Sequence, residues 1–103
     1  MAAEVGTRIS ALTTVPADFR LEQNYPNPFN PSTSIDYALP RDSNVKLEVF
    51  NLIGERVRVL QDGWQNAGYH KVVFRANQLP SGVYTYRIQA GEFVETKKLM
   101  LVK

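Results

Sequence analysis

Apolar residues recur at every second position in several short runs of this chain, and this period limits what the chain can fold into. Ile35, Tyr37 and Leu39, for example, alternate with an aspartate and an alanine. A period of two gives a β-strand one apolar face and one wetter face, as in a half-buried antiparallel sheet. The runs with this pattern are residues 35–39, 45–49, 57–59, 72–74, 84–88 and 93–102.

Turn residues separate these runs. Leu79-Pro-Ser-Gly82 has the Pro and Gly positions of a type I turn, Asn51–Gly54 suits a hairpin with a left-handed Gly, and Ala90-Gly91 is the tightest connection. Short strands about 8 to 12 residues apart, with no helical period, predict an all-β fold. We therefore expect an immunoglobulin-like antiparallel β-sandwich of about seven strands.

Two segments call for separate predictions. Pro26 and Pro28 are two residues apart, so their missing N–H groups would face one side of an extended edge strand, and the chain would leave the sheet near Asn30. The last run, residues 93–102, is apolar on both faces from Leu99 to Val102, which favours a more central strand.

Length and composition indicate one folded domain behind a linker. The chain has 103 residues and is 44% hydrophobic, with no cysteine and no apolar run approaching the roughly 20 residues of a membrane helix. Residues 1–20 are small and polar and predict a partly mobile linker, which leaves residues 21–103 as the domain. Residues 1–20 also lack a signal-peptide pattern, so a signal for export would lie upstream.

The charge is unevenly distributed. The net charge of +2 is too small to indicate a nucleic-acid partner, but residues 1–55 carry −3 and residues 56–103 carry +5. We interpret the basic half first as solvated strand faces and second as a docking surface for an acidic partner.

No residue set predicts catalysis or a cofactor. His70 is the only histidine and has no second ligand at metal spacing, so we expect it on the surface. Glu48 and the other carboxylates near the hairpins are expected to be solvated. The glycines are dispersed and form no phosphate-binding loop, so we expect no enzyme, no metal and no cofactor.

Aromatic residues leave one alternative open. Tyr84 and Tyr86 share a strand face and are expected in the core, whereas Trp64 lies between Gly and Gln in a loop. An exposed Trp64 beside Tyr69 would provide a stacking platform for sugars, as in a carbohydrate-binding module of a polysaccharide-degrading enzyme. A third interpretation is that the domain serves only as a structural spacer.

Five motifs occur in a fixed order along the chain. They are Tyr-Pro-Asn-Pro-Phe at residues 25–29, a strand, hydrophobic-hydrophobic-Gly turn and strand at 45–57, Gly-Tyr-His at 68–70, Ser-Gly-Val-Tyr at 81–84, and Gly91 with Lys97 and Lys98. Together they resemble the type A C-terminal sorting domain of the type IX (Por) secretion system of Bacteroidetes. The C-terminal sandwich of flagellar hook-capping proteins shares the middle motif loosely but not the Tyr-Pro-Asn-Pro-Phe opening.

The resemblance implies an immunoglobulin-like sandwich that directs an N-terminal cargo domain from the periplasm through the outer-membrane type IX translocon. It also implies a cell-surface sortase that removes the domain, leaving the cargo outside or on the cell surface. We expect a monomer or weak dimer without a transmembrane segment. The residues that it suggests for translocon recognition are Gly82, Gly91, Lys97, Lys98, Leu101, Val102 and Lys103. The expected sortase cleavage region is marked by Ala11, Val15, Ala17 and Arg20.

An exposed edge strand offers one mechanism of recognition. A partner can pair with such an edge through backbone hydrogen bonds and read alternate side chains. Because of its position and its lysine pair, the strand at Phe93–Val102, or the edge beside it, is the segment that we expect to make this contact.

Overall fold

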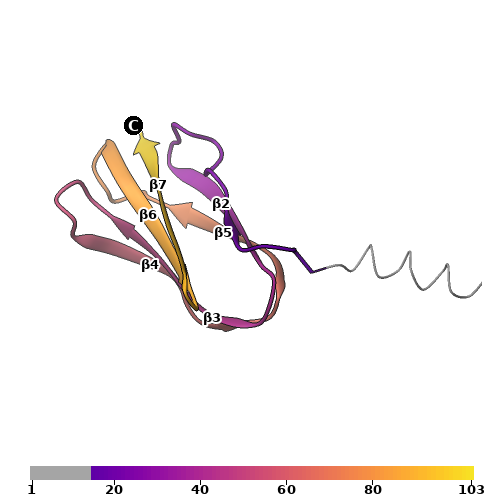
Figure 1. Cartoon of the computed structure of the whole chain (residues 1–103). Coiled ribbons are helices and arrows are strands. Elements are labelled where there is room, and N and C mark those ends of the chain that lie inside the picture. The colour runs from indigo at the N-terminus through magenta and orange to yellow at the C-terminus, as the bar shows by residue number, and fades with distance from the viewer. Residues whose placement is uncertain (1–14) are drawn as a thin grey trace, which may run out of the picture.

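The computed structural model describes residues 15–103, which fold into two antiparallel sheets packed face to face (Figure 1). This confirms the predicted all-β, immunoglobulin-like sandwich, and residues 15–103 contain no helix. The seven strands are β1 (Arg20–Leu21), β2 (Ser32–Leu39), β3 (Ser43–Phe50), β4 (Arg56–Gln65), β5 (Gly68–Arg75), β6 (Gly82–Ala90) and β7 (Phe93–Leu101).

The smaller sheet has the order β1-β2-β5 and the larger sheet the order β4-β3-β6-β7. All neighbouring strands are antiparallel, and β6 and β7 form a hairpin in which Ala90 pairs with Phe93 across a two-residue turn. Gly91 in that turn has φ +62° and Gly54 in the β3–β4 turn has φ +86°, as the turn chemistry predicts.

The period-two residues of both sheets form the core. On β2, β3 and β6 the alternate apolar side chains point between the sheets and are almost completely buried. Burial of such side chains is the main force that holds the two layers together. The largest fully buried side chains are Tyr86, Phe29, Phe74, Ile35, Leu39, Leu47, Ile88, Leu99, Leu101, Val45 and Val49.

The proline-rich segment does not form the predicted edge strand. It makes only two isolated bridges, one antiparallel between Tyr25 and Ser34 of the smaller sheet and one parallel between Phe29 and Leu101 of the larger sheet. The segment therefore crosses from one sheet to the other. The physical reason is Phe29, whose side chain is buried in the core against Phe74, with ring centroids 5.7 Å apart.

The strand β7 lies at the edge of the larger sheet and not at a central position. The apolar character of Leu99–Val102 on both faces reflects two different environments. Leu99 and Leu101 point into the core, whereas Met100 and Val102 stay partly exposed beside the proline-rich segment.

Ordered packing begins slightly before the predicted start at Leu21. Phe19 stacks on Phe93 with ring centroids 5.2 Å apart, and Arg41 lies over the same ring at 5.0 Å. Of the predicted linker, residues 1–14 lie outside the described residues.

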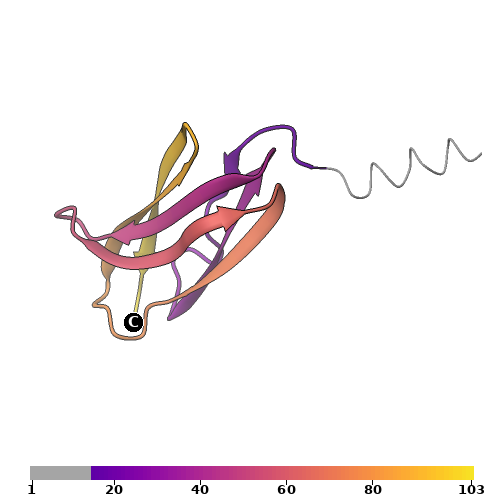
Figure 2. The ribbon, with the colours of Figure 1, turned by 90° about the horizontal axis from the view of Figure 1, so that it is seen from below.

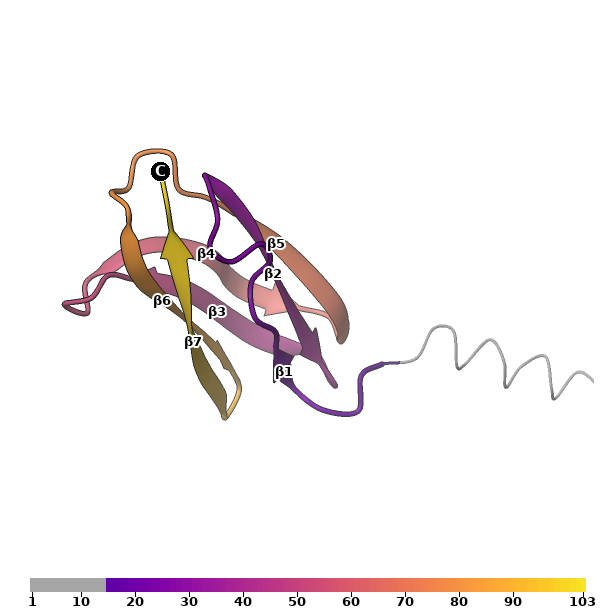
Figure 3. The ribbon, with the colours of Figure 1, turned by 90° about the horizontal axis from the view of Figure 1, so that it is seen from above.

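Strand register defines two ends of the sandwich (Figures 2 and 3). At the entry end lie residues 15–19, the turns at 40–42 and 66–67, and the turn at 91–92. At the opposite tip end lie the β3–β4 turn at 51–55, the connection 76–81 and residues 101–103.

Candidate recognition surface

Four of the residues predicted to contact the translocon meet at the tip end. Gly82 begins β6 and pairs with Leu101 at the end of β7. Lys103 is fixed next to them, because its backbone N–H donates to Ser81 Oγ at 3.0 Å and its Nζ donates to the Asn77 carbonyl at 2.8 Å. Val102 is partly exposed between them, whereas Leu101 is buried, so Leu101 can contribute only by holding the strand in place.

The other three predicted residues lie elsewhere. Gly91 is at the entry end, at the far end of β6 from Gly82. Lys97 and Lys98 are adjacent in β7 and therefore point to opposite faces. Lys97 is half-buried and pairs with Glu95 at 3.4 Å, while Lys98 is exposed on the outer face. The seven residues thus do not form a single patch.

Much of the outer edge of β7 is already occupied. Its backbone accepts a hydrogen bond from Gln23 Nε2 at Lys98 O, and its Met100 N–H donates to Asn27 Oδ1 at 3.0 Å. Phe29 then pairs with the strand through both its N–H and its carbonyl. A partner strand cannot add along this part of β7 without displacing residues 23–29, which argues against the expected edge contact from Lys98 onward.

The predicted cleavage region lies at the entry end as far as the structure describes it. Ala11 is outside the described residues, and Val15 and Ala17 are exposed. Arg20 belongs to β1, pairs with Ala38 and forms an ion pair with Glu22 at 3.1 Å. Between residue 15 and β1, the chain is therefore exposed to a protease at Val15 and Ala17, whereas Arg20 is held in the sheet.

The sugar-binding alternative requires Trp64 and Tyr69 to lie side by side as an aromatic platform, and in the structure they do not. Trp64 is 67% exposed and Tyr69 is 71% exposed. Trp64 pairs with Asn44 on the outer face of the larger sheet, whereas Tyr69 pairs with Ala38 on the outer face of the smaller sheet. The two rings lie on opposite sides of the sandwich and cannot stack on one ligand. Tyr84 and Tyr86 are buried in the core, as predicted.

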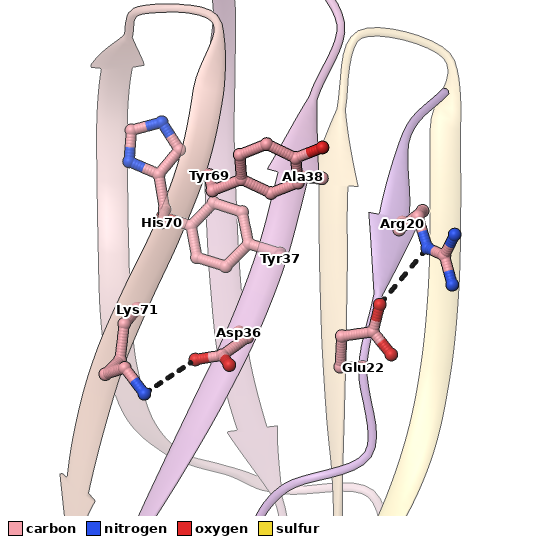
Figure 4. A pocket seen from close by; sticks show the side chains of 8 residues that line it. All are labelled: Arg20, Glu22, Asp36, Tyr37, Ala38, Tyr69, His70 and Lys71. Atoms are coloured by element: carbon pink, nitrogen blue, oxygen red, sulfur yellow. Dashed lines mark hydrogen bonds and ion pairs between the residues drawn. The ribbon is translucent and has the colours of Figure 1, made fainter. Parts of the chain in front are cut away.

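Tyr69 lines a shallow depression of about 590 Å³ on the smaller sheet (Figure 4). Its charged side chains pair with one another, Arg20 with Glu22 at 3.1 Å and Lys71 with Asp36 at 3.4 Å. The charges around this depression are thus mutually neutralised, and they leave little driving force for a charged ligand.

His70, which was expected on the surface, is half-buried at the edge of the same depression. Its ring stacks on Tyr37 with centroids 5.3 Å apart, and its Nε2 lies 2.8 Å from the Asn66 carbonyl oxygen. Across residues 15–103, no group of three or more His, Cys, Asp or Glu side chains could hold a metal ion. In that same range no helix is long and apolar enough to cross a membrane.

Glu48 is not solvated, contrary to the prediction. It is only 5% exposed on the outer face of the larger sheet, because Arg56 and Arg87 cover it from the two neighbouring strands, at 3.0 Å and 3.4 Å. Burial alone would raise the pKa of Glu48, but the hydrogen bonds from the two arginines, together with the positive charges of Lys46 and Arg56, outweigh burial and hold this pKa below its ordinary value. Arg87 also packs over the Phe50 ring at 4.9 Å. The charges of Glu48, Arg56 and Arg87 pair with one another, so this cluster stabilises the sheet and offers no free charge to a ligand.

Sequence reasoning missed two highly exposed aliphatic side chains at the tip end, Leu52 and Ile53. Their signal is a pair of adjacent aliphatic residues inside a turn that Asn51 and Gly54 delimit. A turn of this kind usually carries polar residues.

Comparison with known proteins agrees with the motifs. No curated protein matches the chain. A family model described as the secretion system C-terminal sorting domain matches residues 23–103, which cover the proline-rich segment and strands β2 to β7. The chain therefore belongs to the type IX secretion system C-terminal sorting domains.

Proposed function

We propose that the two ends of this sandwich have separate roles, with the tip end read by the type IX translocon and the entry end cut by a cell-surface sortase. The chain is a C-terminal sorting signal for type IX secretion, which destines a protein for the cell surface or the extracellular space. The family match over residues 23–103 is the observation that carries the proposal. The sorting-domain family is not catalytic.

The proposed recognition surface consists of Gly82, Leu101, Val102 and Lys103. Their support is proximity, since β6 and β7 pair Gly82 with Leu101 and a hydrogen bond ties Lys103 to Ser81. A surface on regular strands is presented in one conformation, which reduces the entropy lost on binding. In this proposal the translocon also contacts Gly91, in the β6–β7 turn, and Lys97 and Lys98, within β7, as secondary sites outside the main surface.

The proposed cleavage lies before β1, within the region marked by Ala11, Val15, Ala17 and Arg20. A cut between Val15 and Phe19 would leave all seven strands intact. A cargo domain ahead of this segment would join the sandwich at the entry end and leave the tip end accessible. The cargo would pass through the periplasm, cross the outer membrane and then be released or attached to the surface.

An export assay tests the proposal. The chain is fused behind a signal-peptide-bearing fluorescent reporter in a host with a functional type IX translocon, and the reporter outside the outer membrane is quantified. We expect export that stops when the translocon is inactivated, with a product mass that places the cut within residues 11–20. Reporter that stays in the periplasm on a folded domain would overturn the sorting role.

A variant pair separates the two ends. Val102→Asp with Lys103→Glu changes the recognition surface, and Trp64→Ser changes an exposed side chain at the entry end. The first is expected to reduce export and the second to leave it unchanged. Equal export of all three chains would exclude the tip end as the recognition surface.

A further inference from the structure

The turn between β3 and β4 exposes two neighbouring aliphatic side chains. Leu52 is 75% exposed and Ile53 is 79% exposed, whereas the next most exposed large aliphatic side chain in residues 15–103, Val94, reaches 54%. The turn projects beyond the neighbouring strands in both Figures 2 and 3. We call this pair the apolar tip.

Polar groups hold the turn in place without help from the apolar tip. Asn51 Oδ1 accepts hydrogen bonds from the N–H of Ile53 at 3.1 Å and from the N–H of Glu55 at 2.9 Å. Asn51 Nδ2 donates to the Glu55 carboxylate at 2.8 Å, and Gly54 donates its N–H to the Asn51 carbonyl at 3.0 Å. Gly54 supplies the left-handed conformation, with φ +86°. The fold therefore gains nothing visible from aliphatic residues at positions 52 and 53.

A rigid turn with two solvated aliphatic side chains is a preorganised contact. The side chains lose hydration when they enter an apolar site, and the fixed backbone keeps the ordering cost small. A shallow groove of about 260 Å³ joins the apolar tip to Ser81, Gly82 and Val83. The apolar tip is thus continuous with the proposed recognition surface.

We propose that the apolar tip inserts into a concave apolar pocket of a protein receptor in the type IX export machinery, an inference that rests on the proposed sorting function. A pocket fits because the tip is narrow and convex. Two side chains offer far less than the roughly 800 Å² per partner that a stable dimer needs, so a second copy of the chain is disfavoured.

Charge disfavours a lipid surface. Loops that insert into anionic membranes place Lys or Arg beside their apolar residues. Here the turn itself carries only the carboxylate of Glu55, held against Asn51, and the next residue, Arg56, is paired with Glu48. The ammonium of Lys103, at the same end, is held by the Asn77 carbonyl. A protein pocket therefore matches the tip better than a headgroup layer does.

The test compares three chains in the reporter export assay. The tip variant carries Leu52→Ser and Ile53→Ser. The matched control carries Val59→Ser and Val73→Ser, two exposed aliphatic residues on β4 and β5, away from the turn. The conservative variant, Leu52→Val with Ile53→Leu, keeps the turn apolar. Thermal melting of each purified chain confirms that it is folded.

We expect the tip variant to melt within a few degrees of the parent chain and to lose export at least tenfold, since each buried aliphatic side chain contributes about that factor. The control and the conservative variant should export normally. If the serine pair unfolds the chain, Leu52→Asn with Ile53→Asn replaces it, because Asn suits turns.

Normal export of a folded tip variant would overturn the inference while leaving the sorting function intact. Absence of export for the parent chain would instead reject the sorting function. Co-sedimentation with vesicles of phosphatidylethanolamine and phosphatidylglycerol tests whether the apolar tip binds lipid instead. If the parent chain binds these vesicles and the tip variant does not, the protein-pocket assignment is overturned.

Discussion

The hydroxyl group of Tyr86 fastens one sheet of this domain to the other, and its removal offers a sharp test of how the sandwich is closed. Tyr86 of β6 in the larger sheet donates a hydrogen bond to the Glu22 carbonyl at 2.7 Å. It accepts another from the N–H of Asn24 at 2.8 Å. Glu22 and Asn24 lie where the chain leaves β1 of the smaller sheet, so these bonds fasten the start of the proline-rich segment to the opposite layer.

The substitution Tyr86→Phe removes only this hydroxyl. The N–H of the buried Asn24 would lose its partner, which costs about 1 to 3 kcal/mol, and the hydrogen bond to Glu22 would add about 0.5 to 1.5 kcal/mol. We expect the free energy of unfolding to fall by about 2 to 3 kcal/mol. With an unchanged m-value, this corresponds to a urea midpoint lower by about 1 to 2 M.

Tyr84→Phe is the matched control. Its hydroxyl donates to the carbonyl of Pro80 at 2.6 Å, but Pro80 is exposed and water can replace the lost donor. We expect a cost below about 1 kcal/mol. Native-state hydrogen exchange should show faster exchange at the Asn24 amide in Tyr86→Phe only. The reasoning is refuted if Tyr86→Phe unfolds at the parent midpoint, or if Tyr84→Phe costs as much.

Three further predictions concern pH and packing. Burial raises the pKa of Tyr86 to about 12 from 10.0, so the folded chain keeps this proton between pH 10 and 12 while the unfolded chain loses it. Unfolding measured across that range should show stability falling by up to about 1.4 kcal/mol per pH unit, and this contribution should be absent in Tyr86→Phe. The two arginines lower the pKa of Glu48 below 4.5, so its stabilisation is present above that pH and lost on acidification through the folded-state pKa. Glu48→Gln should cost about 1 to 2 kcal/mol at pH 7 and reduce the loss of stability in acid, as urea midpoints at pH 3 and 7 would reveal. Phe29→Ala should cost about 3 to 5 kcal/mol in the same assay, because it empties a buried core position that packs on Phe74.

The strands could be predicted from sequence because burial in a sandwich follows side-chain alternation, which is a local property. The proline-rich segment could not. The parity of Pro26 and Pro28 constrains which N–H groups are missing, but it contains no information about the partner of Phe29. That partner, Leu101, lies 72 positions further along the chain and pairs in parallel.

The environment of Glu48 was also beyond sequence reasoning, for a similar reason. Arg56 and Arg87 come from strands on either side of β3, and they meet over Glu48 only in the observed register. The recognition surface was predictable in part. Gly82 and Val102 meet because β6 and β7 form a simple hairpin, whereas the joining of Leu52 and Ile53 to the same end depends on how β3 pairs with β6.

Removal of the last strand segment cannot separate recognition from folding in this domain. Deletion of Leu99–Lys103 would remove two fully buried leucines and the strand partner of Phe29, so the sandwich would lose its core at the tip end. Loss of export after such a deletion follows from unfolding alone. Side chains that face solvent at the same end avoid this problem, since Leu52, Ile53 and Val102 can change without creating a cavity. Substitutions at such exposed positions can therefore show whether the translocon reads this surface or merely requires a folded domain.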